Sequence, residues 1–218
     1  MPQHRSLLLL AWLLINLISF PNQVQAADPF PQTVEIADKT LKKNGEALCE
    51  WGIFGLDLYR VALWVEKPSS NAKQLLSSEQ VRCLELRFVR SLSQKQMREA
   101  YEESIKANQP ANDKKLKASI QKFIESVKAA SKGSSMKLIC LPGKGLELRQ
   151  GKEKILVEGD RQFLDLILKL YIGNKPPTPE VAKGLLGNHP NTVADLPKGP
   201  AKAEEKLKKV PEPDARQR

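Results

Sequence analysis

The stretch from Asp57 to Val65, DLYRVALWV, constrains the fold more than any other part of the chain. Alternate residues of a strand point to opposite faces of a sheet. Here both alternate sets are largely apolar: Asp57, Tyr59, Val61, Leu63 and Val65 form one, and Leu58, Arg60, Ala62 and Trp64 form the other. A strand that is largely apolar on both faces is typical of the inside of a sheet. We therefore expect this strand to have a partner on each side.

A second strand is predicted at Val81 to Arg90, where the two faces differ more clearly. One face is apolar and is expected to lie in the core: Leu84, Leu86 and Phe88. Glu85 and Arg87 share the opposite face two residues apart, so they can either pair with each other or line a cleft. We interpret them first as an ion pair on the surface of the sheet.

The rest of the central region alternates blocks of strands and helices. Further strands are predicted at Thr33 to Ala37, Ala47 to Ile53, Met136 to Leu141, Gly145 to Arg149 and Lys154 to Glu158. Helices are predicted from the cap Ser93 to Asn108, from Asp113 to Gly133, from the cap Asp160 to Gly173, and from the cap Thr178 to Gly187. This order predicts an α+β fold, in which helices cover one face of an antiparallel sheet.

Both ends of the chain differ in composition from the region between them. Residues 1–26 combine a charged start, an apolar run of fourteen residues from Leu7 to Phe20, and Val24-Gln25-Ala26. This is the pattern of a secretory signal peptide cleaved after Ala26. Residues 188–218 are rich in Pro, Lys, Ala and Glu, which is typical of disorder. We expect a periplasmic or secreted protein with one domain at residues 28–187 and a disordered basic tail at residues 188–218.

The formal net charge is +10, which is basic enough to suggest an acidic partner. The lysines are scattered, however, and the sequence has no basic strip with interleaved aromatics and no nucleic-acid motif. We therefore expect no nucleic-acid partner and favour a solvated basic face, with the tail able to contact anionic lipid headgroups. No later stretch is apolar enough to span a bilayer, so the mature protein is expected to lack a transmembrane span.

Histidine and cysteine usage excludes several kinds of chemistry from the predicted domain. His4 lies in the signal peptide and His189 in the tail, so histidine-dependent catalysis and histidine-ligated metal sites are excluded. Cys49, Cys83 and Cys140 are far apart and include no CxxC pair. One disulfide with one remaining thiol, and three buried free thiols, are both open alternatives. No glycine motif for nucleotides is visible, and we expect no metal or cofactor.

Four segments in a fixed order carry a resemblance to a known family. They are WG followed by LDLYRVALWVE within Trp51 to Glu66, LELRFVRSLS at Leu84 to Ser93, GDRQFLDLILKLYIGNKPP at Gly159 to Pro177, and GLLG at Gly184 to Gly187. Together they are similar to the chalcone isomerase-like family, and specifically to its small secreted bacterial branch. The resemblance implies an open-faced β-sandwich, with a ligand cleft between a long antiparallel sheet and a layer of helices.

The resemblance also implies two functional groups, enzymes that close a chalcone into a flavanone and non-catalytic relatives that bind fatty acids. The enzymes hold their substrate with an arginine, a threonine, a tyrosine and an asparagine. At the matching positions this chain has Cys49, Glu50 and Trp51 for the arginine, Tyr59 for the threonine, Met97 for the tyrosine and Ser104 for the asparagine. Because a developing enolate needs a cation or strong donors, these four differences argue against the cyclisation.

The remaining features favour a binding pocket. Trp51, Tyr59 and Met97 are large or adaptable apolar side chains, and Arg87 or Arg90 can meet a carboxylate. The predicted ligand-binding residues are Trp51, Tyr59, Arg87, Arg90, Met97 and Ser104. We expect a non-catalytic protein that binds a small amphipathic ligand such as a fatty acid. The alternatives are an intramolecular lyase acting on a chalcone-like enone, and an envelope interaction protein that uses the basic tail.

Overall fold

The structure is a computed structural model that describes residues 29–51, 55–109 and 114–187. The predicted signal peptide and the predicted tail lie outside these residues, as does Ile53, the predicted end of the second strand. The chain divides into two units between Phe30 and Pro31, and the fold belongs to the second unit. Among the described residues, no helix combines the length and the apolar character needed to cross a membrane.

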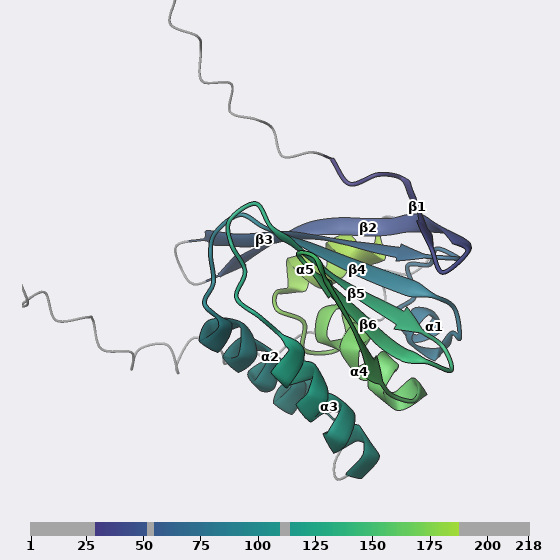
Figure 1. Cartoon of the computed structure of the whole chain (residues 1–218). Helices are drawn as coiled ribbons and strands as arrows, with labels where there is room; N and C mark the ends of the chain where they lie inside the picture. Colours follow the sequence, from purple (N-terminus) through teal and green to yellow (C-terminus); the bar gives the residue numbers. More distant parts are fainter. Residues whose placement is uncertain (1–28, 52–54, 110–113, 188–218) are drawn as a thin grey trace, which may run out of the picture. The chain divides into compact units, whose positions relative to one another are not determined.

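In the described part of the second unit, seven antiparallel strands form one sheet, and each strand pairs with the next along the chain (Figure 1). They are β1 (Thr33–Ile36), β2 (Lys39–Trp51), β3 (Leu56–Val65), β4 (Arg82–Phe88), β5 (Ser135–Leu141), β6 (Gly145–Gln150) and β7 (Glu153–Glu158). β3 pairs with β2 on one side and β4 on the other. The prediction that this strand lies inside the sheet is therefore confirmed.

Five helices are described in the same unit: α1 (Ala72–Ser77), α2 (Gln94–Asn108), α3 (Lys114–Ser126), α4 (Arg161–Ile172) and α5 (Pro179–Leu186). α5 packs on β2 and α4 lies beside α5, while α2 and α3 contact each other and α4 (Figure 1). The buried residues of these helices and of one sheet face share a single hydrophobic core. The predicted α+β fold, an antiparallel sheet with a helical layer on one face, is confirmed.

Three helices begin at their predicted capping residues. The Gln96 backbone N–H donates to Ser93 Oγ at 3.2 Å, and the Ser93 N–H donates to the Gln96 side-chain oxygen at 2.9 Å. This reciprocal pair satisfies two backbone donors at the start of α2. Asp160 and Thr178 each accept a backbone N–H in the first turn of α4 and α5. Local side-chain chemistry therefore sets the starts of these helices.

The predicted end of α3 is wrong, because this helix stops at Ser126 and does not continue to Gly133. Ala130 instead pairs with Leu92 in an antiparallel bridge, in which each backbone N–H donates to the other residue's carbonyl at 2.8 to 2.9 Å. Gly133 has a φ of +82° in the turn that leads into β5. The glycine therefore ends a connection that is paired with another segment, and a pairing between distant residues leaves no local signal.

β2 begins at Lys39, eight residues before its predicted start, and α1 was not predicted at all. Asn44-Gly45 lies within β2, and an Asn-Gly pair ordinarily signals a tight turn. In the structure the register of β2 against β3 shifts between Lys43 and Gly45, which is a β-bulge. α1 is 6 residues long and buries only Leu75, too little for an apolar stripe to be recognised.

The bulge in β2 is where α5 comes into backbone contact with the sheet. A Cβ added to Gly45 would lie 2.1 Å from the Gly184 carbonyl oxygen, and one added to Gly184 would lie 2.5 Å from the Glu46 oxygen. The buried Asn44 side chain also donates to the Leu185 carbonyl at 2.7 Å. Two glycines and one amide thus hold α5 directly on β2.

Candidate functional site

Four buried polar side chains gather between the sheet and the helices, and we call them the tyrosine cluster: Cys49, Tyr59, Tyr101 and Tyr171. Cys49 comes from β2, Tyr59 from β3, Tyr101 from α2 and Tyr171 from α4. The chain contains three tyrosines, and all of them belong to this cluster. The cluster is therefore a concentrated group of hydroxyl and thiol groups within an otherwise apolar core.

The cluster consists of two pairs. The Tyr101 and Tyr171 hydroxyl oxygens are hydrogen-bonded at 2.8 Å, and Cys49 and Tyr59 face each other across β2 and β3, where their side chains interact. A single bond between two hydroxyls uses one of their two hydrogens. Among the described residues, neither hydroxyl of the Tyr101 and Tyr171 pair forms a second hydrogen bond. One O–H group of this pair therefore keeps an unused donor.

The strands and helices place the cluster residues for simple reasons of register and spacing. Cys49 lies directly opposite Tyr59 in the β2 and β3 pairing, and Tyr59 lies opposite Phe88 on the other side. On α2, Met97, Tyr101 and Ile105 recur every four residues and form the buried stripe. This spacing places the Tyr101 ring in the core, against α3 and α4.

Two aromatic contacts fix the ring positions. The Tyr59 and Phe88 rings meet edge to face with centroids 6.0 Å apart. The Tyr101 ring meets Phe123 of α3 in the same way at 4.9 Å. These are favoured geometries for aromatic pairs, because the positive edge of one ring meets the negative face of the other. The hydroxyl groups are thereby held at one place in the core.

The cluster is neutral at physiological pH. Burial raises the pKa of each of the three tyrosines above the ordinary value, and the bond to Tyr171 opposes this rise for Tyr101. Burial also raises the pKa of Cys49, with an opposing contribution from the Tyr59 side chain and a further rise from Glu50. The cluster thus offers protonated hydroxyls and a thiol rather than an ionised base.

The structure brings together two of the predicted ligand-binding residues, Tyr59 and Met97, which both belong to the core. Ser104 is half-buried on α2, and Arg90 is exposed beyond the end of β4. Trp51 ends β2 opposite Leu56, and its side chain lies outside what the structure describes. The predicted residues therefore do not converge as a single group.

Arg87 lies on the other face of the sheet from Tyr59. Its neighbours Leu86 and Phe88 point into the core, so Arg87 points away from the helices. Its Nε lies 2.8 Å from Glu85 Oε1, and Lys137 Nζ lies 3.2 Å from Glu85 Oε2. The interpretation of Glu85 and Arg87 as an ion pair on the sheet surface is confirmed.

Sequence reasoning did not identify Tyr101, Tyr171 and Cys49 as ligand-binding candidates. The first two fall within helices that were predicted, from Ser93 to Asn108 and from Asp160 to Gly173, and both side chains lie in the core. The usable signal was that every tyrosine of the chain recurs in step with apolar residues in a predicted strand or helix, because a Tyr hydroxyl that is buried in this way needs a partner. Their convergence, however, depends on helix packing.

All three cysteines are buried free thiols, which decides between the two alternatives for their redox state. Burial raises the pKa of Cys83 to about 12 and that of Cys140 to about 11. Cys83 also shares the outward face of β4 with Glu85, whereas Cys140 lies in the core. These thiols are therefore protonated and weakly reactive at neutral pH.

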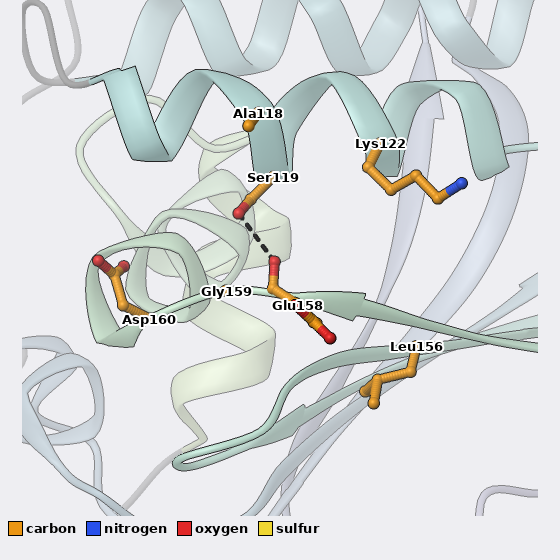
Figure 2. A pocket seen from close by; sticks show the side chains of 7 residues that line it. All are labelled: Ala118, Ser119, Lys122, Leu156, Glu158, Gly159 and Asp160. Carbon is orange, nitrogen blue, oxygen red and sulfur yellow. Dashed lines mark hydrogen bonds between the residues drawn. The ribbon is translucent and has the colours of Figure 1, made fainter.

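A surface groove of about 650 Å³ lies between α3, β7 and the start of α4 (Figure 2). Its lining residues are Ala118, Ser119, Lys122, Leu156, Glu158, Gly159 and Asp160. Ser119 Oγ donates to the Glu158 carbonyl at 2.8 Å across it, and Asp160 caps α4. The groove is open and bears both charge signs, so it lacks the apolar enclosure that is typical of a small-molecule site.

Both a family model and a solved structure match this chain. The chalcone isomerase-like family matches residues 23–187. A solved fatty-acid binding protein of Arabidopsis thaliana is similar in structure, with a TM-score of 0.57, 17% sequence identity, and coverage of 74% of this chain and 95% of that chain. No curated protein matches the sequence. Because the family match covers most of the chain and the fold agrees with it, the chain belongs to the chalcone isomerase-like family.

Proposed function

We propose that this is a non-catalytic binding protein that takes a small amphipathic ligand, such as a fatty acid, between its helices and its sheet. The observation that carries the proposal is the tyrosine cluster within the hydrophobic core. A similar fold in a fatty-acid binding protein of Arabidopsis thaliana adds support. An apolar site with a few convergent polar groups is the usual composition of a small-molecule pocket.

Core packing alone does not explain why these positions have tyrosine and not phenylalanine. Phenylalanine would fill nearly the same volume as tyrosine, and burying a hydroxyl costs free energy that its hydrogen bond only roughly offsets. The Tyr101 and Tyr171 hydroxyls come from two different helices and bond mainly to each other. A ligand headgroup that enters between α2 and α4 can replace this bond and use the unused donor.

The protonation state of the cluster supports a non-catalytic role. Tyr59, Tyr101 and Tyr171 all have a raised pKa, so none provides a base near neutral pH. Met97, which stands where the family's enzymes have a tyrosine, has no hydrogen-bond donor in its side chain. The buried neighbours of the cluster are apolar: Phe88, Met97, Ile105 and Phe123. Such surroundings suit an acyl chain.

The N-terminal sequence supports export of this protein to the periplasm or the medium. The charged start, apolar run and Val24-Gln25-Ala26 fit a cleaved signal peptide. N-terminal sequencing of the protein recovered from its own cell envelope is expected to begin at Ala27. Recovery of the intact N-terminus from the cytoplasm would contradict this part of the proposal.

Native mass spectrometry tests the binding function. Protein purified from its own compartment should carry an adduct of lipid mass, and delipidated protein should take up one equivalent of an added C10 to C16 amphiphile. A clean apo mass before and after the addition would contradict the proposal. Turnover of a chalcone-like enone that falls in Tyr59→Phe would instead support the intramolecular lyase.

A further inference from the structure

The charges around the tyrosine cluster restrict the ligands that it can hold. Arg87, which adjoins Phe88, the β4 partner of Tyr59, lies on the opposite face of the sheet and is paired with Glu85. Arg82 does lie on the helix side, but at the other end of β4. Arg82 lies six positions before Phe88, which pairs with Tyr59, so the separation is about 20 Å along the strand.

The Arg82 guanidinium is also already engaged. Its side chain is 2% exposed, and Nη1 donates to the carbonyls of Leu75 and Leu76 at 3.1 and 3.3 Å and to Asp165 Oδ1 at 3.2 Å. Arg82 therefore stabilises the junction of α1 and α4. It is not available to a headgroup at the tyrosine cluster.

The electrostatic surroundings of the cluster agree with this geometry. The charge interactions on Tyr59 come from Cys49 and Tyr101, and those on Tyr171 come from Tyr101, Tyr59 and Cys49. The charge interaction on Cys49 comes from Glu50, a negatively charged side chain that raises the pKa of the thiol. The side chains that act on the cluster hydroxyls are thus tyrosines and a cysteine, none of which carries a positive charge.

A carboxylate would be costly in such a place. An ionised group moved from water into a low-dielectric interior loses several kcal/mol of hydration free energy unless a counter-ion offsets the loss. Without a counter-ion, the group takes up a proton and binds in its neutral form. Glu50 beside Cys49 adds a repulsion of the same sign. Hydroxyl groups alone can bind an uncharged hydroxyl or carbonyl group of a ligand, because each can donate one hydrogen bond and accept others.

We propose that the tyrosine cluster selects an uncharged amphiphile, one apolar chain ending in a hydroxyl or carbonyl group, as in a long-chain alcohol, a monoacylglycerol or a protonated fatty acid. This inference rests on the proposed binding function and narrows its ligand class. The unused O–H of the Tyr101 and Tyr171 pair donates to the ligand oxygen, and the partner hydroxyl accepts from a ligand hydroxyl.

Calorimetric titration with 1-decanol and decanoic acid, which have equal chain lengths, tests the inference on the full mature chain. At about pH 8 the alcohol is expected to bind at least about tenfold more tightly than the acid, because the acid must first take up a proton. Between about pH 8 and pH 5 the affinity for the alcohol should stay constant while that for the acid rises. Tighter binding of the acid at about pH 8 would overturn the inference and leave the binding function intact.

Two variants sharpen the result. Tyr101→Phe combined with Tyr171→Phe keeps the ring volumes, and it should weaken binding of decanol at least about fivefold by removing two headgroup partners. Arg87→Gln, on the far face of the sheet, should leave the affinities for both ligands unchanged. Selective loss of decanoic acid binding in Arg87→Gln would overturn the inference. If neither ligand binds the wild-type protein, both the inference and the binding function are wrong.

Discussion

The Tyr101 and Tyr171 hydroxyl oxygens lie 2.8 Å apart, although the two residues are 70 positions apart in the chain. The bond joins α2 to α4 inside the core, where each hydroxyl is cut off from water. A buried hydroxyl that loses its only partner retains the full cost of its own burial. The stability of the helical layer should therefore depend on the pair as a unit.

Replacing either Tyr101 or Tyr171 should show that stability depends on the bond between their hydroxyls. Tyr101→Phe is expected to lower the free energy of unfolding by about 1–3 kcal/mol, because the Tyr171 hydroxyl then stays buried without a partner. The double variant Tyr101→Phe/Tyr171→Phe should lose less than the sum of the single losses. Urea denaturation of all four proteins measures the coupling. Strictly additive losses would show that the two hydroxyls do not stabilise each other.

Alkaline pH should destabilise this protein, because unfolding allows the buried tyrosine hydroxyls to ionise. Burial raises the pKa of all three tyrosines above their ordinary 10.0 and that of Cys83 from 9.0 to about 12. Between the ordinary and the raised pKa, the unfolded chain has lost protons that the folded chain still holds. The free energy of unfolding must then fall as pH rises above about 9, by about 1.4 kcal/mol per pH unit for each such group.

Absorbance at the tyrosinate band, followed together with circular dichroism, checks this expectation. Tyrosinate should appear only as the far-ultraviolet signal of the fold is lost, because the folded state keeps its hydroxyls protonated. Tyrosinate that forms near the ordinary pKa with the fold intact would mean that water reaches the cluster.

The sequence predicted the fold well where local rules apply. The alternation in β3, the capping box at Ser93 and the cap at Asp160 depend on neighbouring residues, and all were confirmed. The errors arose where a distant contact overrides the local signal. Asn44-Gly45 has the composition of a turn, yet it forms a bulge because α5 packs on it.

That contact gives a direct prediction about α5. Gly184→Ala should lower the free energy of unfolding by about 1–3 kcal/mol, because the new Cβ would lie 2.5 Å from the Glu46 carbonyl oxygen. In an ordinary helix interior the same change would be stabilising. Lys183→Ala, at the exposed neighbouring position, is the control and should change stability by less than about 0.5 kcal/mol. Equal urea midpoints for the two variants would contradict the close packing.

Arg82 and Arg161 both reach Asp165, but only Arg82 is buried. Arg82 Nη1 and Arg161 Nε lie 3.2 and 3.6 Å from the carboxylate, with side-chain exposures of 2% and 50%. Arg82→Leu should cost about 3–5 kcal/mol of stability, because it removes three hydrogen bonds and leaves Asp165 without its buried partner.

Arg161→Leu serves as the matched comparison, and it should cost about 1 kcal/mol or less because water screens a half-exposed pair. Thermal or urea unfolding of the two variants measures the difference. A larger loss for Arg161→Leu than for Arg82→Leu would show that the buried contact is not the stabilising one.

The candidate site was only partly predictable, for a physical reason. Tyr59 and Met97 could be predicted as pocket residues from their apolar character and from the family resemblance, although both faces of β3 are largely apolar and alternation alone does not show which face meets the helices. Tyr101 and Tyr171 come from separate helices, and only the way those helices pack together shows that their hydroxyls meet. Arg87 was a candidate by charge alone, whereas the register of β4 places it on the far face.

The most direct test of the account is nuclear magnetic resonance of the protein with isotope-labelled tyrosine rings. The chain has three tyrosines and all three lie in the cluster, so every labelled signal reports on the proposed site. On addition of 1-decanol, the Tyr101 and Tyr171 signals are expected to shift and to show contacts to the ligand's first methylene groups. Decanol that is bound by mass but leaves all three tyrosine signals unchanged would contradict the account.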